Sequence, residues 1–240
     1  MSATLAIAGR ECRAMFFTPA GYIIICIFAM ALGVVFSLAA VFEQGQLATL
    51  QLLFTWSGWL LMLICPAVSM RAISEELRLG TFESLVTSPV SEAQIVLGKF
   101  LGSLAFLIAL LLPTLAFVAA LEVYGRPDYG ELACGYVGIL IAGSAYLATG
   151  VLASSLTPSQ VLAFLLSVFF WLSLGLTTTL LPHQLTHETA VKIAYALNPI
   201  HRLNDFAIGL VDTSNIIYFV SFAAIFLALA VLSLKLRRVL

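Results

Sequence analysis

Five long stretches of this 240-residue chain contain no Asp, Glu, Lys or Arg. They are residues 14–42, 44–70, 100–121, 132–187 and 213–234. A helix needs about 20 apolar residues to cross the hydrocarbon of a membrane, so the four shorter stretches each hold one helix. The fifth stretch is long enough for two helices, separated at Thr157-Pro158-Ser159. The sequence therefore predicts six spans, near residues 20–42, 47–70, 99–121, 132–156, 160–181 and 214–234.

Composition agrees with an integral membrane protein. Hydrophobic residues make up 62% of the chain and charged residues 10%, whereas a soluble domain has about 45–50% and about 25%. The apolar runs are continuous, and a membrane β-barrel would instead show segments of about ten residues with alternating polarity. Residues 21–42 are also longer than the apolar region of a signal peptide, so we expect a retained helix. The predicted fold is a single all-α transmembrane domain over residues 1–240.

The distribution of basic residues predicts the orientation. Eight of the 11 Lys and Arg residues fall on one side of the predicted spans: Arg10, Arg13, Arg71, Arg78, Lys99, Lys235, Arg237 and Arg238. Arg126, Lys192 and Arg202 fall on the other side. The positive-inside rule then places both termini and the loop between the second and third spans in the cytoplasm. The net charge of −1 and the absence of a basic block argue against nucleic-acid binding.

Two segments outside the spans have the spacing of amphipathic helices. In the first, Leu5, Ala8, Cys12 and Phe16 share a face and Arg10 and Arg13 point away, which predicts an elbow helix along the inner interface. In the second, Asn198 caps a helix that has Pro199 at its first position. Its apolar face comprises Ile200, Leu203, Ala207 and Leu210, and its polar face His201, Asp205 and Asp212. This helix lies at or dips into the outer interface, or is an ordinary loop helix.

Two features within the predicted spans concern helix packing. Small residues recur every three or four positions in the fourth span, at Gly135, Gly138, Ala142, Ala145 and Thr149. Such a stripe allows close approach of helices, and we interpret it as internal packing rather than a subunit contact. Pro113 predicts a kink in the third span.

Because ionisable groups are missing at membrane depth, the sequence disfavours an ion-coupled secondary transporter.

Neither nucleotide binding nor metal binding is predicted for this chain. The one Gly-Lys pair, Gly98-Lys99, has Ala93 where a phosphate loop begins with glycine and Phe100 where it needs Ser or Thr. We therefore expect a non-catalytic protein without a cofactor of its own. His183 and His187 have the spacing of a helical metal pair, but we interpret them as part of a solvated loop.

The segment between the second and third spans is the most informative part of the sequence. A helix from Ser74 to Val86 has Glu75 and Glu76 in its first turn, where carboxylates offset the helix dipole. The helical spacing of these residues predicts two faces. The apolar face comprises Leu79, Phe82 and Val86, and the acidic face, towards the cytosol, comprises Glu76, Gly80, Glu83 and Ser84. Ser91 and Gln94 form a capping box that begins the next helix.

This segment resembles the type-2 (ABC-2) permease subunits of ABC transporters, in particular the branch with gliding-motility-type and copper-enzyme-maturation permeases. The matching residues are Glu75, Glu76, Gly80, Thr81, Glu83, Leu85, Thr87, Pro89, Val90, Ser91, Gly98 and Lys99. Further matches are Phe17, Pro19, Gly21 and Tyr22 before the first span, and Asn198, Pro199, Phe206, Gly209, Asp212 and Tyr218 before the last.

The resemblance implies a permease subunit of the bacterial inner membrane. Two such chains, identical or related, pair in the membrane on two ATPase subunits, which bind ATP and Mg²⁺. The ATPase-coupling residues would be Glu75, Glu76, Leu79, Gly80, Thr81, Phe82, Glu83 and Leu85. The outer interfacial helix would include Pro199, Phe206, Gly209 and Asp212. The implied function is ATP-driven export. The alternative is a scaffold that passes ATPase motion to a periplasmic or membrane-anchored partner.

Overall fold

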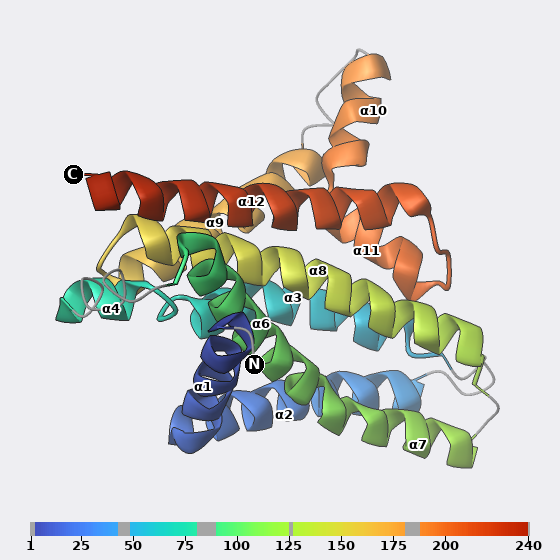
Figure 1. Ribbon diagram of the computed structural model, residues 1–240. Coiled ribbons are helices and arrows are strands. Elements are labelled where there is room, and N and C mark those ends of the chain that lie inside the picture. Colours follow the sequence, from blue (N-terminus) through green and yellow to red (C-terminus); the bar gives the residue numbers. More distant parts are fainter. Residues whose placement is uncertain (1–2, 43–48, 81–89, 125–126, 181–187, 240) are drawn as a thin grey trace.

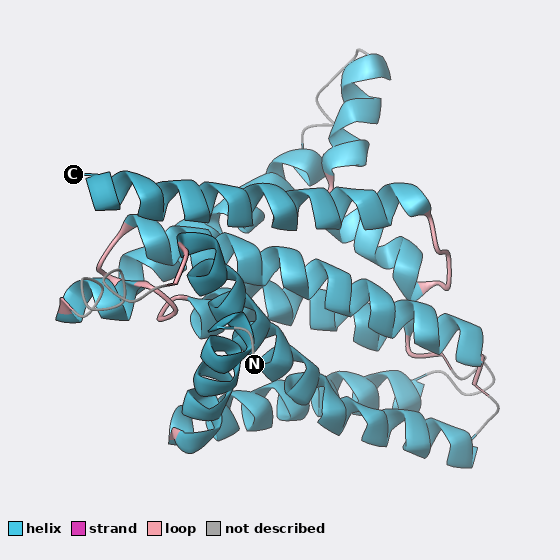
Figure 2. Ribbon diagram, in the orientation of Figure 1, coloured by secondary structure: helices cyan, strands magenta, loops and turns pink. Residues whose placement is uncertain are grey.

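The computed structural model describes residues 3–42, 49–80, 90–124, 127–180 and 188–239, and the regular structure of these residues is entirely helical (Figures 1 and 2). The helices are α1 (Ala3–Phe17), α2 (Pro19–Phe42), α3 (Gln51–Ser69), α4 (Ser74–Leu79), α6 (Glu92–Leu111), η1 (Leu112–Thr114), α7 (Leu115–Tyr124), α8 (Tyr129–Leu156), α9 (Gln160–Leu180), α10 (Glu188–Leu197), α11 (Pro199–Ala207) and α12 (Thr213–Val239). Six helical segments of the described residues are long and apolar enough to cross a membrane. The prediction of an all-α protein with six spans is confirmed.

The span boundaries follow the sequence closely. α8 ends at Leu156 and α9 begins at Gln160, so the predicted break at Thr157-Pro158-Ser159 is confirmed. The third span bends where Pro113 lies in the 3₁₀ turn η1, between α6 and α7. α6 begins at Glu92 directly after the Ser91 capping box, which is confirmed, and Lys99 therefore lies about two turns inside the helix.

α8 is the central helix of the bundle, and it packs against α3, α9, α11 and α12 (Figure 1). Its small residues accept large side chains from neighbouring helices. A Cβ atom at Gly135 would lie 2.4 Å from the Phe54 ring, and one at Gly138 would lie 2.4 Å from Cβ of Phe206. Thr149 accepts a 3.0 Å hydrogen bond from Nε1 of the buried Trp171. The interpretation of this stripe as internal packing is confirmed.

The two ends of the bundle differ. One end, the α4 end, carries α4, the turn between α8 and α9, and the C-terminal end of α12 (Figure 1). The opposite end, the α11 end, carries the first turn of α8 and the connection from α11 to α12 (Figure 1). Near the α11 end, α10 projects sideways from the bundle (Figure 2). The two longest connections between spans run from α3 to α6 and from α9 to α12, and they contain α4, α10 and α11. These segments are the candidates for interaction with partners.

Candidate functional site

α4 is fixed to the α4 end of the bundle at its first residues. The turn that leads into it places Ala72 and Ile73 in a small core with Val96, Val151, Ala230 and Leu234 of α6, α8 and α12. The hydroxyl of Ser74 donates a hydrogen bond to the Met70 carbonyl oxygen, which closes the turn. The helix ends at Gly80, whose φ of +71° lies in the left-handed region that favours glycine. α4 is therefore a short helix with a buried beginning and an exposed end.

The structure corrects the prediction of one helix from Ser74 to Val86. The left-handed conformation of Gly80 ends α4 at Leu79, and Thr81, Phe82, Glu83, Leu85 and Val86 lie outside the described residues. The predicted cytosolic position is also wrong for Glu76, which points inward, whereas Leu79 is 62% exposed and stays available to the membrane interface. The inward position of Glu76 has an electrostatic cause, since a buried lysine lies beneath it.

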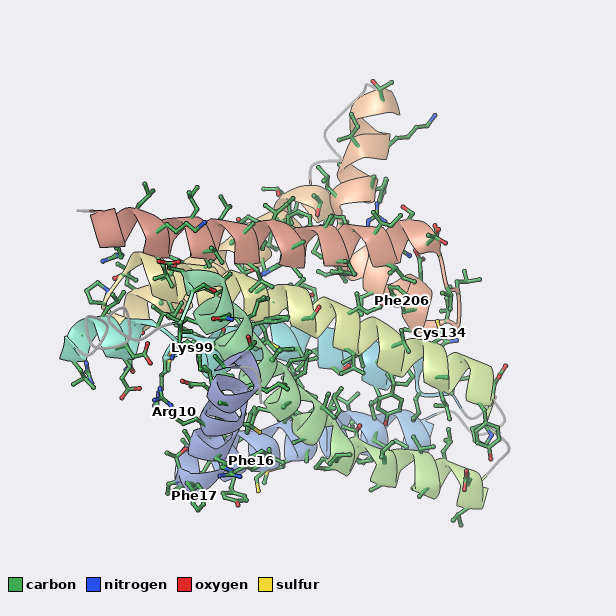
Figure 3. The ribbon with its side chains drawn as sticks, viewed as in Figure 1. Arg10, Phe16, Phe17, Lys99, Cys134 and Phe206 are labelled. Atoms are coloured by element: carbon green, nitrogen blue, oxygen red, sulfur yellow. The ribbon has the colours of Figure 1, made fainter. Side chains whose placement is uncertain are left out.

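That lysine is Lys99 of α6, at the centre of four charged residues that we call the Lys99 cluster: Arg10, Glu11, Glu76 and Lys99. Its Nζ atom lies 2.8 Å from Oε1 of Glu11 in α1 and 2.8 Å from Oε1 of Glu76 in α4. Nη2 of Arg10 lies 3.4 Å from the same Glu76 oxygen. Figure 3 shows Arg10 and Lys99 where α1 crosses α6 beside α4. The cluster thus joins three helices that are far apart in the sequence.

Burial makes these contacts strong. The side chain of Lys99 is 2% exposed, and those of Glu11 and Glu76 are 17% and 15% exposed. A charge that is removed from water needs close partners of opposite sign. The two carboxylates and two cations of the cluster balance, and removal of one partner of a buried pair costs about 3–5 kcal/mol. We therefore expect the cluster to stay paired in the folded chain.

Two glycines of α6 bring α1 close enough for this pairing. A Cβ atom at Gly98 would lie 2.8 Å from Cβ of Ile7, and one at Gly102 would lie 2.7 Å from Cβ of Glu11. The Phe16 ring packs on the Phe106 ring at a centroid distance of 5.6 Å and holds the other end of α1 (Figure 3). The elbow helix is thus packed on α6 as well as being amphipathic.

The packed face of α1 overlaps the predicted one but is wider. Ala8, Cys12 and Phe16 are partly buried on the side of α6, as predicted, whereas Leu5 is exposed. Ile7 and Glu11 also lie against α6. Apolar spacing alone missed the wider face, because a charged residue belongs to it. The signal that was available is Gly98-x-x-x-Gly102 with a lone lysine inside it, since small residues three or four apart mark a close helix contact and an ionisable residue in a span needs a partner.

A hollow lies beside α4 on the same end of the bundle. It has a volume of about 380 Å³ and is lined by Arg78 and by residues 158–161 at the start of α9. The hollow therefore lies between α4 and the α8–α9 turn.

At the α11 end, the helix before the last span is wedged into the bundle. Asn198 caps α11 by accepting hydrogen bonds from the backbone N–H groups of Ile200 and His201. Pro199 is buried in the first turn, and Phe206 is fully buried against Gly138 of α8. Leu203 packs on Gly58 of α3. The apolar face of this helix therefore contacts protein.

Polar contacts tie α11 to α12. Arg202 donates to the carbonyl oxygen of Ala196 at 2.6 Å and to Oδ1 of Asn215 at 2.7 Å. Its guanidinium lies 4.6 Å from the centre of the Tyr218 ring. Gly209, with a φ of +83°, ends the α11 segment, and Asp212 accepts a hydrogen bond from the Ser214 N–H at the start of α12. α11 and α12 are thus held together by Arg202.

No group of three metal-ligating side chains occurs within the residues that the structure describes. His183 and His187 lie outside these residues.

Comparison with known proteins gives one family. The family model described as ABC-2 family transporter protein matches residues 34–234, which is most of the chain. The match begins within α2, the first span, and includes the other five. A comparison with curated proteins gives no match.

Proposed function

The chain belongs to the ABC-2 family of transporter membrane proteins, and from that premise we propose that it is the membrane-spanning subunit of an ATP-driven exporter. Members of the family are typically non-catalytic membrane subunits, and the family generally implies an ATPase partner. Movement of a substrate across the membrane would then depend on ATP hydrolysis by the ATPase subunit. The description of the family as a transporter favours export over a scaffold that moves no substrate.

The observation that best supports this proposal is the form of α4. Its last residues are exposed, whereas the turn that leads into it is packed through Ala72 and Ile73 on α6, α8 and α12. A helix built in this way can take up a displacement at its exposed end and pass it to the spans. We propose that an ATPase subunit docks on α4 and the segment that follows it, with Glu75, Leu79 and Phe82 among the contacts.

The assembly proposed here has two ATPase subunits and two permease chains, identical or related. The α4 end would face the cytoplasm of a bacterial cell, because it carries most of the basic residues. The pattern from Glu75 to Lys99 supports membership of the branch that includes gliding-motility-type and copper-enzyme-maturation permeases.

Purification of the tagged chain in mild detergent tests the proposal. We expect one ATPase subunit per permease chain, and ATP hydrolysis only where that subunit is present. Phe82 is the single aromatic residue between Ser74 and Val86, and a central aromatic anchor is worth about 2 kcal/mol or more in an interface. Phe82→Ala should therefore weaken the association more than about tenfold, since about 1.4 kcal/mol is one decade.

A second variant separates docking from membrane anchoring. Glu83→Arg should slow association with the ATPase more at low salt than at high salt, because salt screens exposed charges. If Phe82 only anchors the segment in lipid headgroups, Phe82→Leu restores function and copurification never changes. Wild-type copurification in both Phe82→Ala and Glu83→Arg would contradict the docking assignment.

A further inference from the structure

Among the Lys and Arg side chains whose burial the structure describes, that of Lys99 alone is buried. Loss of Lys99 alone would leave two carboxylates without their buried partner, but stability does not demand an ion cluster at this position. Well-packed apolar residues often replace a buried ion pair without loss, so an ion pair that is kept in a protein interior can instead serve to fix one arrangement of the chain. The question is which parts of the chain Lys99 arranges.

The answer follows from the helices that supply its partners. α1 packs on α6 and α2, and α4 packs on α8 and α9, so the two helices have different packing partners. They meet through Glu11 and Glu76, which both direct Oε1 at the same Nζ atom at 2.8 Å. Two carboxylates that share a site repel each other when no cation lies between them. Arg10 of α1 also lies 3.4 Å from Glu76, but its side chain is 65% exposed, so water and salt weaken this pair. The Lys99 ammonium is therefore the buried cation that makes the contact between α1 and α4 attractive.

We propose that Lys99 is a positioning residue that holds the coupling helix α4 to the elbow helix α1, so that the two move as one unit. The inference rests on the proposed function in one respect, namely that α4 receives the motion of the ATPase. A displacement of α4 would reach α3 directly through the chain. Through Lys99 it would also reach α1, which continues at Pro19 into α2, the first span. The displacement of α4 would then reach both α3 and α2.

Spin-label distances in the isolated chain, reconstituted in lipid nanodiscs, test the inference. Labels are placed at Ala6→Cys in α1 and Arg78→Cys in α4, both exposed positions, after replacement of the four native cysteines. The wild-type chain should show one narrow distance distribution. Lys99→Met should lose it and give a broad distribution with a longer mean distance. Lys99→Arg keeps the cation and should retain most of the narrow distribution. Lys235→Met, the same change at an exposed lysine of α12, is the matched control.

Single carboxylate variants keep the test decisive if Lys99→Met does not fold. In Glu76→Gln, Lys99 remains paired with Glu11, so α1 should stay on α6 while α4 is released. The distance from Ala6→Cys to a label at the exposed position Leu97→Cys of α6 should then be unchanged, while the distance to Arg78→Cys broadens. General unfolding would broaden both distances. A narrow distribution from Ala6→Cys to Arg78→Cys in Lys99→Met, or in Glu76→Gln, overturns the inference.

These outcomes are separate from the fate of the proposed function. The distances are measured without an ATPase, so a chain that recruits no ATPase would refute the exporter assignment and leave the role of Lys99 standing. Conversely, Lys99→Met with wild-type copurification and an unchanged distance would refute the role of Lys99 alone.

Discussion

The contact between α1 and α6 makes a quantitative prediction for Gly102→Ala. The added Cβ would lie 2.7 Å from Cβ of Glu11 and 3.0 Å from the carbonyl oxygen of Ala8. The second neighbour is backbone and cannot rotate away, so α1 must shift. Overpacking of this kind costs about 1–3 kcal/mol. The gain in helix propensity of α6 from glycine to alanine is the same whether α1 is docked or not, so it does not offset this cost.

The perturbation should appear as opening of α1. Cys12 is partly buried in α1, and its backbone nitrogen would lie 3.4 Å from the new Cβ. A cost of about 1–3 kcal/mol raises the open population about fivefold to more than a hundredfold, and the labelling rate of Cys12 by a maleimide in a chain without other cysteines should rise with it.

Gly9→Ala is the matched control, because it makes the same change within α1 where a Cβ meets nothing within 4 Å. Its labelling rate should stay within about twofold of wild type, as for ordinary surface substitutions. Equal Cys12 labelling in wild type, Gly102→Ala and Gly9→Ala would refute the argument that Gly102 seats the elbow helix.

Three further predictions follow from the described contacts. In intact spheroplasts, an impermeant thiol reagent should label the exposed Tyr129→Cys and spare Arg78→Cys, and the reverse pattern would overturn the predicted orientation. Trp171→Phe removes the 3.0 Å hydrogen bond to Thr149 and should lower the free energy of unfolding by about 0.6–2 kcal/mol. Adding Thr149→Val should lower that free energy little further. Additive losses would show that the two side chains act independently. Arg202→Lys keeps the charge but not the planar guanidinium, and should loosen α11 from α12 as measured by hydrogen exchange. Unchanged exchange would contradict that role.

Cys134 suits such a topology experiment poorly. The sequence places Cys134 near the end of a span that is predicted to face outward, which made it a natural labelling site. The structure buries its side chain, so a lack of labelling there would not report on orientation. Tyr129, in the first turn of the same helix, is 65% exposed and reports the same end of the bundle.

Sequence reasoning succeeded where one physical rule acts alone. The absence of charge over 20 or more residues is sufficient to locate spans, and Pro113 and the Ser91 capping box act through their own backbone geometry. The small residues of α8 needed only the rule that close helix packing requires small side chains. In each case a pattern within one segment is sufficient, and the identity of its partners elsewhere in the chain is not needed.

The faces of α1 and α4 could not be predicted in full in this way, because they also depend on a residue far away in the sequence. Glu76 belongs to a hydrophilic face when α4 is considered alone, yet it points inward because Lys99 lies 23 residues further along the chain. Glu11 joins the packed face of α1 for the same reason, at a separation of 88 residues. Apolar periodicity ranks a carboxylate as solvent-facing, and only knowledge of a buried partner reverses that ranking.

The pair Gly98-Lys99 shows how two adjacent residues divide these tasks. Neighbours on a helix point about 100° apart, so they meet different parts of the structure. Gly98 meets Ile7 and the carbonyl oxygen of Thr4, where a side chain would displace α1. Lys99 meets the carboxylates of Glu11 and Glu76. Gly98 allows α1 to lie close to α6. Lys99 attracts both α1, through Glu11, and α4, through Glu76. Gly98→Ala should therefore separate α1 from α6 without removing a charge, whereas Lys99→Met removes the cation that Glu11 and Glu76 share and should separate α1 from α4.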